Sequence, residues 1–275
     1  MLQLIVSLLT SMSHTQADPN KSTTAIKSER VWSPYELTQL SRHKVSTGLI
    51  IDTESPVEYL TGHVDFAGLD FLVSKETLIP RVETEELVGL AWNILEEQIS
   101  VGITPCVLDV GTGCGAIAIS LAYRAAQAGK TVQILATDIS STALKVAEKN
   151  THRLTPKANI QFLQSDLLAA VPKQQQFTLI TANLPYIPTE RIAYLESSVK
   201  DFEPQVALDG GSDGLYLIKL LLSSAADLLQ QNSKVVLEVD YTHTVENFLE
   251  FRPNWTITSS FDTYNRNRFI IATKK

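Results

Sequence analysis

The pattern of apolar and polar positions changes period along the chain, and from Cys106 onward it repeats. Short apolar runs typical of buried strands are separated by stretches whose apolar residues fall on one face of a helix. This alternation predicts an α/β fold with a doubly wound, mostly parallel sheet. Seven strands are expected, at residues 106–110, 132–137, 159–163, 177–182, 234–239, 254–260 and 267–273. Helices are expected between them, at about 115–128, 141–151, 214–230 and 243–250.

Two details of the pattern describe how this sheet packs. The helix expected at 214–230 carries an apolar stripe at helical spacing, which predicts a buried face formed by Leu215, Ile218, Leu222, Ala225 and Leu229. The last two strands are joined only by the short polar segment 261–266. We therefore expect them to pair antiparallel, because a parallel connection needs a longer crossover.

The front of the chain is expected to be less regular. The apolar residues 1–9 predict an N-terminal helix rather than a secretory signal, since no basic residue precedes them and no cleavage pattern follows. Residues 10–30 are polar and lack periodicity, as in a linker. Ser33-Pro34-Tyr35-Glu36 has the residues of a helix cap, which predicts a helix as far as about His43.

A small connecting region is expected between this helix and the sheet. Residues 55–62 predict one helical turn ended by glycine, and 64–66 with 69–73 predict a β-hairpin. A helix follows at about 85–99, with one apolar face made of Leu87, Leu90, Ala91, Ile94 and Leu95. The predicted organisation is therefore a short helical and linker region at 1–54, a β-hairpin connector at 55–84 and the sheet domain at 85–275.

Composition narrows the class of protein. Of 275 residues, 44% are hydrophobic and 19% are charged, as in globular domains. The formal net charge of -7 argues against broad adhesion to nucleic acid, which needs a basic surface. The two cysteines fit neither a disulfide framework nor a zinc spacing and favour the cytoplasm. No apolar run has the length of a membrane span, and no metal site is predicted.

The segment richest in chemical information is Asn183-Leu184-Pro185-Tyr186, which follows a predicted buried strand. In an open parallel sheet, the carboxyl ends of the strands form the ligand-binding edge. The Asn183 side-chain oxygen and the Leu184 carbonyl can accept both hydrogens of a planar NH2 group. Pro185 confines Leu184 to extended conformations, and Tyr186 offers a flat stacking face. The segment is typical of a site for an amide or amino nitrogen, although a four-residue match also fits an ordinary turn.

A second motif lies upstream, where residues 107–116 read Val-Leu-Asp-Val-Gly-Thr-Gly-Cys-Gly-Ala. Glycines between a strand and a helix let the backbone approach a ligand, and the helix N-terminus can bind an anionic group. The candidate contacts in this turn are Gly111, Thr112, Gly113, Cys114 and Gly115. The same glycines also satisfy a dinucleotide fingerprint, so the turn alone leaves the cofactor open.

Acidic residues at successive strand ends help to choose between cofactors. Asp138 ends the next strand and is placed to accept hydrogen bonds from ribose hydroxyls, which both nicotinamide dinucleotides and S-adenosylmethionine carry. Asp109 precedes the glycines, where it can face a ligand ammonium group that a pyrophosphate lacks. Asp166 and Leu167 follow the third strand, where an adenine edge is expected. Singly, each aspartate also fits a cap or turn role.

Together, the glycine loop, Asp138 and Asn183 to Tyr186 resemble S-adenosylmethionine-dependent methyltransferases that act on planar nitrogens. More narrowly, the chain from about residue 55 onward resembles the peptide chain release factor glutamine methyltransferase family. The segments that carry this resemblance are 56–62, 78–84, 107–116, 202–208, 210–214 and 262–268. The tetrapeptide Tyr-Leu-Thr-Gly at 59–62 and the tripeptide Ile-Pro-Arg at 79–81 distinguish this family from adenine amino methyltransferases.

The resemblance implies methylation of the glutamine amide in the Gly-Gly-Gln motif of release factors, with a release factor as protein partner. From the composition, no membrane is expected and nucleic acid is disfavoured as a partner. Gly111 to Gly115 and Asp138 would hold the methionine and ribose parts of the cofactor, with Asp166 and Leu167 near its adenine. Asn183 and the Leu184 carbonyl would hold the glutamine NH2 in a slot shaped by Pro185 and Tyr186. Asn183 would also border the cofactor.

The chain departs from the family pattern at three points. The family usually has Pro in place of Leu184 and in place of Val82, and it has a larger helical domain before the matched region. Three alternatives stay open: an adenine amino methyltransferase acting on DNA or RNA, an inactive cofactor- or partner-binding module, and, more distantly, a dinucleotide oxidoreductase. Arg81 and Glu203 are expected either to line the cleft or to form a structural ion pair.

Overall fold

The structure is a computed structural model that describes residues 30–50 and 54–275. The chain divides into a unit of residues 1–31 and a compact unit of residues 32–275, which holds every element named below. The expected N-terminal helix at 1–9 and the expected linker at 10–30 lie outside the described residues. The boundaries expected at 54/55 and 84/85 stay predictions.

A seven-stranded sheet forms the centre of the second unit, with the strand order β5-β4-β3-β6-β7-β9-β8. The first five strands in this order run parallel, whereas β9 pairs antiparallel with both β7 and β8. The expected fold class and the antiparallel final pair are therefore confirmed. The strands span Cys106–Val110 (β3), Gln133–Asp138 (β4), Asn159–Gln164 (β5), Phe177–Ala182 (β6), Leu229–Glu238 (β7), Trp255–Phe261 (β8) and Asn267–Lys274 (β9).

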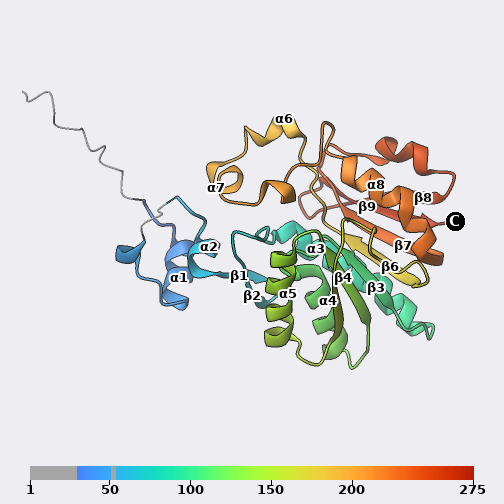
Figure 1. The fold of residues 1–275 in the computed structure, drawn as a ribbon, viewed down its shortest axis with the longest axis horizontal. Coiled ribbons are helices and arrows are strands. Elements are labelled where there is room, and N and C mark those ends of the chain that lie inside the picture. The colour runs from blue at the N-terminus through green and yellow to red at the C-terminus, as the bar shows by residue number, and fades with distance from the viewer. Residues whose placement is uncertain (1–29, 51–53) are drawn as a thin grey trace, which may run out of the picture. The chain divides into compact units, whose positions relative to one another are not determined.

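Helices cover both faces of this sheet (Figure 1). On one face lie α3 (Val82–Ser100), α4 (Ala116–Gln127) and α5 (Ser141–Leu154). On the other face lie α8 (Tyr216–Ala225), η3 (Ala226–Leu228) and η4 (Val245–Phe251). Neighbouring strand residues alternate between the two cores: Val107 packs with the α3 side and Leu108 with the α8 side. This alternation is the period-2 pattern of a strand that is buried on both faces.

Short elements complete the unit. Before the sheet come α1 (Pro34–Arg42), η1 (Thr47–Leu49), α2 (Val57–Thr61), β1 (His63–Phe66) and β2 (Leu69–Leu72). Between β6 and α8 lie α6 (Thr189–Ile192), α7 (Ser197–Lys200) and η2 (Gln205–Ala207). The α1 prediction is confirmed in detail, because Ser33 and Glu36 form both hydrogen bonds of a capping box.

Two predicted helices need correction. The helix expected at 214–230 begins only at Tyr216, because Gly214 has φ 73°. It continues as the 3-10 turn η3, and Leu229 then extends to pair with Phe177, so β7 starts earlier than the expected residue 234. The helix expected at 243–250 is the 3-10 element η4, in which Phe248 leaves helical geometry and is fully buried.

The β1–β2 hairpin has the expected turn, with Ala67 and Gly68 both at positive φ. It is tied to α5 by polar contacts that the sequence pattern did not indicate. Arg153 of α5 donates to the Asp70 carboxylate over 2.9 Å and to the Asp70 carbonyl over 3.1 Å. The connector is thereby fixed to the domain that carries the site.

Candidate functional site

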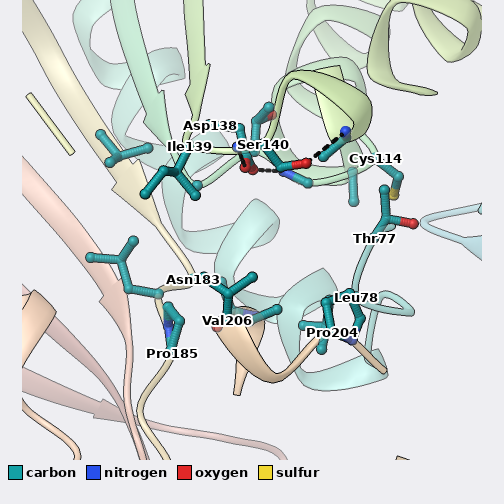
Figure 2. A pocket seen from close by; sticks show the side chains of 18 of the residues that line it. Thr77, Leu78, Cys114, Asp138, Ile139, Ser140, Asn183, Pro185, Pro204 and Val206 are labelled. Carbon is teal, nitrogen blue, oxygen red and sulfur yellow. Dashed lines mark hydrogen bonds between the residues drawn. The ribbon is translucent and has the colours of Figure 1, made fainter. Parts of the chain in front are cut away.

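A cavity of about 210 Å³ opens at the carboxyl ends of β3, β4, β5 and β6. This edge includes the point where the strand order reverses, because β4 and β5 follow on one side of β3 and β6 then lies on its other side. Figure 2 shows Asp138 and Ser140 on one side of the cavity, with Asn183, Pro185 and Val206 on the other. Its two walls therefore come from the two motifs that the sequence analysis singled out.

The glycine loop between β3 and α4 forms the base of the first wall. Gly111 and Thr112 donate their N–H groups to the Thr137 carbonyl over 2.8 and 2.9 Å, which holds the loop against β4. A Cβ on Gly115, which has φ 87°, would lie 2.7 Å from Ile119 Cδ1. Gly115 therefore lets the loop fold tightly onto α4 without itself lining the cavity.

Asp138 faces the cavity from the end of β4. Its Oδ2 accepts from Gly113 N over 2.8 Å and its Oδ1 accepts from Ser140 N over 2.9 Å. Partial burial raises the pKa of this carboxyl, and the two N–H donors work against that rise. Each carboxylate oxygen keeps further acceptor capacity for a donor such as a ribose hydroxyl.

Asp109 is placed differently from the expectation. Its side chain is fully buried and does not line the cavity. The carboxylate accepts from Thr112 Oγ1 and from Thr181 Oγ1, each over 2.7 Å, and so joins β3, β6 and the glycine loop. Burial raises the pKa of Asp109 to about 6, even though these hydroxyls favour the charged form. The described contacts give Asp109 a structural role in place of the expected contact with a ligand ammonium group.

The loop after β6 forms the second wall. Ile187 N donates to the Leu208 carbonyl over 3.1 Å, and Gly210 N donates to the Ile187 carbonyl over 2.9 Å. This pairing lays residues 183–187 beside the segment 208–211. A Cβ on Gly210 would lie 2.7 Å from the Pro185 carbonyl oxygen, so only glycine fits this close approach.

Asn183 lines the cavity, and a hydrogen bond to Thr84 orients its side-chain amide. Its Nδ2 donates to Thr84 Oγ1 over 3.0 Å, and Thr84 Oγ1 in turn donates to Glu238 Oε2 over 2.8 Å. Tyr186 O–H donates to the other oxygen, Glu238 Oε1, over 3.0 Å. Glu238 is only 1% exposed, and burial raises its pKa against the effect of the two hydroxyl donors.

Leu184 replaces the usual family proline without opening a gap in the wall. Its side chain is 5% exposed and packs on the glycine loop, where a Cβ on Gly111 would lie 3.1 Å from Leu184 Cδ2. The two walls therefore touch at their base. A side chain on Gly111 would push them apart.

The structure brings most of the expected site residues into one cavity. Those that line it are Gly111, Thr112, Gly113, Cys114, Asp138, Asp166, Leu167, Asn183, Leu184 and Pro185. Asp109, Gly115 and Tyr186 stand behind its wall instead. Arg81 and Glu203 are also outside the lining and form an ion pair, with Glu203 Oε2 accepting from Ile79 N over 3.1 Å.

Other lining residues were missed, among them Thr77, Leu78, Thr84, Ile139, Pro204 and Val206. The segments 78–84 and 202–208 had been noted for their resemblance to a family, but their residues had no local chemical signal. Asn150 was missed for the same reason. It is fully buried in α5 and donates to the carbonyls of Cys114 and Leu72, each over 2.9 Å, so it clamps the hairpin to the glycine loop.

Comparison with known proteins agrees with this geometry. A family model described as a methyltransferase domain matches residues 106–242. A release factor glutamine methyltransferase of Koribacter versatilis is 37% identical over 201 residues, which cover 73% of this chain and 68% of that protein. The chain belongs to the release factor glutamine methyltransferase family.

Further relatives define how far the likeness reaches. The release factor glutamine methyltransferase of Moorella thermoacetica is 41% identical over 188 residues, covering 67% of this chain but only 62% of that protein. Among solved structures, the hMettl16 catalytic domain in complex with a MAT2A 3'UTR hairpin is similar with a TM-score of 0.58. That match has 19% identity over 75% of each chain, so it concerns the fold alone.

Membership of this family and the methyltransferase-domain match support S-adenosylmethionine as the cofactor. The residues present fit such a group. Asp138 offers acceptor oxygens on one wall, and Asp166 with Leu167 adds a further part of the lining. The glycine loop leaves open space at Gly113, where an added Cβ would meet no atom within 4 Å.

Proposed function

We propose that this protein transfers a methyl group from S-adenosylmethionine to the side-chain amide nitrogen of the glutamine in the Gly-Gly-Gln motif of peptide chain release factors. The observation that carries the proposal is the orientation of Asn183, whose NH2 is tied to Thr84 while its amide lies in the cavity wall. An amide held in this way presents its oxygen to a second NH2 group. The family of the chain supplies the substrate class.

S-adenosylmethionine would be held along the first wall of the cavity. Asp138 would accept hydrogen bonds from the ribose hydroxyls, and Gly111 to Cys114 would lie along the methionine part, while Gly115 lets the loop fold onto α4. Asp166 and Leu167 would border the adenine, and Asn183 would border the methyl group. When bound, S-adenosylmethionine supplies an electrophilic methyl group on a sulfonium, and the C–S bond breaks to a neutral thioether as the new C–N bond forms.

Asn183 and Leu184 act on the nucleophile. An amide nitrogen is a weak nucleophile because its lone pair is delocalised into the carbonyl. Asn183 Oδ1 and the Leu184 carbonyl accept its two hydrogens, which holds the nitrogen in place and favours the positive charge that develops there. After the C–N bond has formed, the N–H is strongly acidic and its proton passes to water, so no residue has to act as a strong base.

Pro185 and Tyr186 shape the slot for the glutamine. Pro185 lines the cavity and keeps Leu184 extended. Tyr186 stands behind the wall, where its hydroxyl is held by Glu238. It therefore contributes chiefly by fixing the loop.

The proposal places the reaction in the cytoplasm, with a release factor as the partner. Cys106 and Cys114 are both free thiols, which suits a reducing compartment. None of the helices in the described ranges combines the length and the hydropathy that a bilayer crossing requires. The net charge of -7 continues to argue against nucleic acid as the substrate.

The test is transfer of labelled methyl from S-adenosylmethionine to a purified bacterial release factor. A release factor with its Gly-Gly-Gln glutamine changed to alanine serves as one control, and unmethylated DNA and RNA serve as others. Label on the normal factor alone supports the proposal. Label on DNA or RNA alone would favour an adenine amino methyltransferase, and cofactor binding without any transfer would favour an inactive module.

A further inference from the structure

The hydrogen bonds behind Asn183 form a series in which each group donates to the next. Asn183 Nδ2 donates to Thr84 Oγ1, and Thr84 Oγ1 donates to Glu238 Oε2. A hydroxyl has only one hydrogen, so once Thr84 donates to a carboxylate, it can only accept from Asn183. Both oxygens of Glu238 are acceptors in the structure, Oε2 from Thr84 and Oε1 from Tyr186, so the series ends at Glu238.

From this series we infer that Thr84 and Glu238 are positioning residues, which set the direction of the Asn183 amide so that Oδ1 rather than Nδ2 faces the reacting nitrogen. The inference rests on the proposed function for its consequence in catalysis. A reversed amide would present two hydrogens to the substrate NH2, and donor would face donor. The direction of a buried amide therefore decides whether this wall attracts or repels the nucleophile.

The surroundings of Glu238 support this role. The side chain is 1% exposed at the end of β7, and its two oxygens bind two different elements of the wall. Oε2 accepts from Thr84 in α3, and Oε1 accepts from Tyr186 in the loop after β6 over 3.0 Å. A buried carboxylate that receives two hydroxyl donors keeps both donors in one geometry. It therefore fixes Asn183 and Tyr186 together.

Thr84 is the best residue for testing the inference, because its hydroxyl can be removed without a change in side-chain size. Thr84→Val keeps the size of the side chain and removes the hydroxyl, so Asn183 loses its acceptor. Thr84→Ser keeps the hydroxyl. Thr178→Val is a matched control for the loss of a buried threonine hydroxyl, since Thr178 lies near the opposite end of β6 and its hydroxyl bonds only to the backbone of Cys106 in the described structure.

The kinetic test compares these variants on a release factor at saturating cofactor. We expect Thr84→Val to lower kcat by about 10- to 100-fold, the effect of a misdirected positioning group, with little change in KM or cofactor Kd. Thr84→Ser should recover most of the turnover. Equal kcat values for Thr84→Val and Thr178→Val would overturn the inference. A decrease in the activity of Thr84→Val that is explained by a higher cofactor Kd would overturn it as well.

A second readout needs no release factor. The side-chain NH2 of Asn183 is followed by ¹⁵N NMR and assigned by its absence in Asn183→Asp. We expect slow hydrogen exchange at this NH2 in the wild-type and Thr84→Ser chains, and fast exchange in Thr84→Val. Equal exchange in all three would contradict the inference. This result stands even where the wild-type chain transfers no methyl, a failure that would count against the proposed function instead.

Discussion

At the scale of single residues, the account depends most on Asn183, the cavity residue whose side chain is both oriented by the protein and free to meet a substrate. We expect Asn183→Ala to lower kcat by about 100- to 1,000-fold, because it removes an acceptor that acts on the reacting nitrogen. The Kd for S-adenosylmethionine should change little. Turnover close to that of the wild-type chain would remove Asn183 from the proposed mechanism.

Asp138 is expected to act on the cofactor rather than on the substrate. In Asp138→Ala, the N–H groups of Gly113 and Ser140 lose their acceptor together with the ribose hydroxyls. We expect Kd for S-adenosylhomocysteine, measured by calorimetry, to rise by about 10- to 100-fold, as for the loss of one or two hydrogen bonds to a charged group. An unchanged Kd would tell against the ribose contact.

Asp109 makes a prediction about stability and pH. Its pKa is raised by burial to about 6, so its folded form favours the neutral acid. The stability that Asp109 contributes is therefore fully present below its unfolded pKa of about 3.9 and is lost as the pH rises through about 6.

The comparison that isolates this effect is urea unfolding of the wild-type and Asp109→Asn chains at pH 4.5 and pH 7.5. Other groups titrate alike in both chains, so their contributions cancel in the difference between the two unfolding free energies. We expect the wild-type chain to lose unfolding free energy relative to Asp109→Asn between the two pH values. A difference that does not change with pH would show that Asp109 keeps an ordinary pKa in the folded protein.

At the scale of elements, the second wall depends on the close approach of two loops. A side chain at Gly210 would meet the Pro185 carbonyl at 2.7 Å and the Gly214 carbonyl at 2.8 Å. Gly210→Ala should therefore displace residues 183–187 and lower kcat by about 100-fold, while cofactor affinity is kept.

Gly89→Ala is the matched control for this change. Gly89 lies in α3, where an added Cβ meets no atom within 4 Å, so alanine should be neutral or slightly stabilising. Both variants are compared by turnover and by thermal unfolding. If Gly210→Ala matched Gly89→Ala in turnover, the loop pairing would not be what positions the slot.

Sequence reasoning predicted these elements well where a local signal existed. The strands β3 and β6 were expected at their observed bounds because both are short apolar runs buried on two faces. The helix expected at 243–250 failed because the burial of Phe248 overrides helical geometry there. The β7 start was misplaced because the pairing of Leu229 with Phe177 is a long-range contact.

The residues of the site were likewise predictable only where a local sequence signal existed. Asp138 and Asn183 were predictable because each follows a strand and carries a recognisable acceptor. Thr84 and Glu238 were not predictable as a pair, since they lie in α3 and β7 and meet only in the folded chain. Asp109 lies outside the cavity lining, because adjacency to the glycines does not determine which face of β3 a side chain takes.

At the scale of the whole molecule, the compact unit of residues 32–275 contains both walls of the cavity. The chain spans 62% of the length of the Moorella relative and 68% of the Koribacter relative. The chemistry of the proposed function uses only groups within this compact unit.

The central claim is that the acceptor nitrogen is a glutamine side-chain amide. The most direct measurement is peptide mass spectrometry of a release factor after reaction with S-adenosylmethionine and the wild-type chain, with Asn183→Ala in parallel. The account predicts one added methyl group on the side chain of the Gly-Gly-Gln glutamine, and almost none with the variant. A methyl group on any other residue, or equal methylation by both chains, would contradict it.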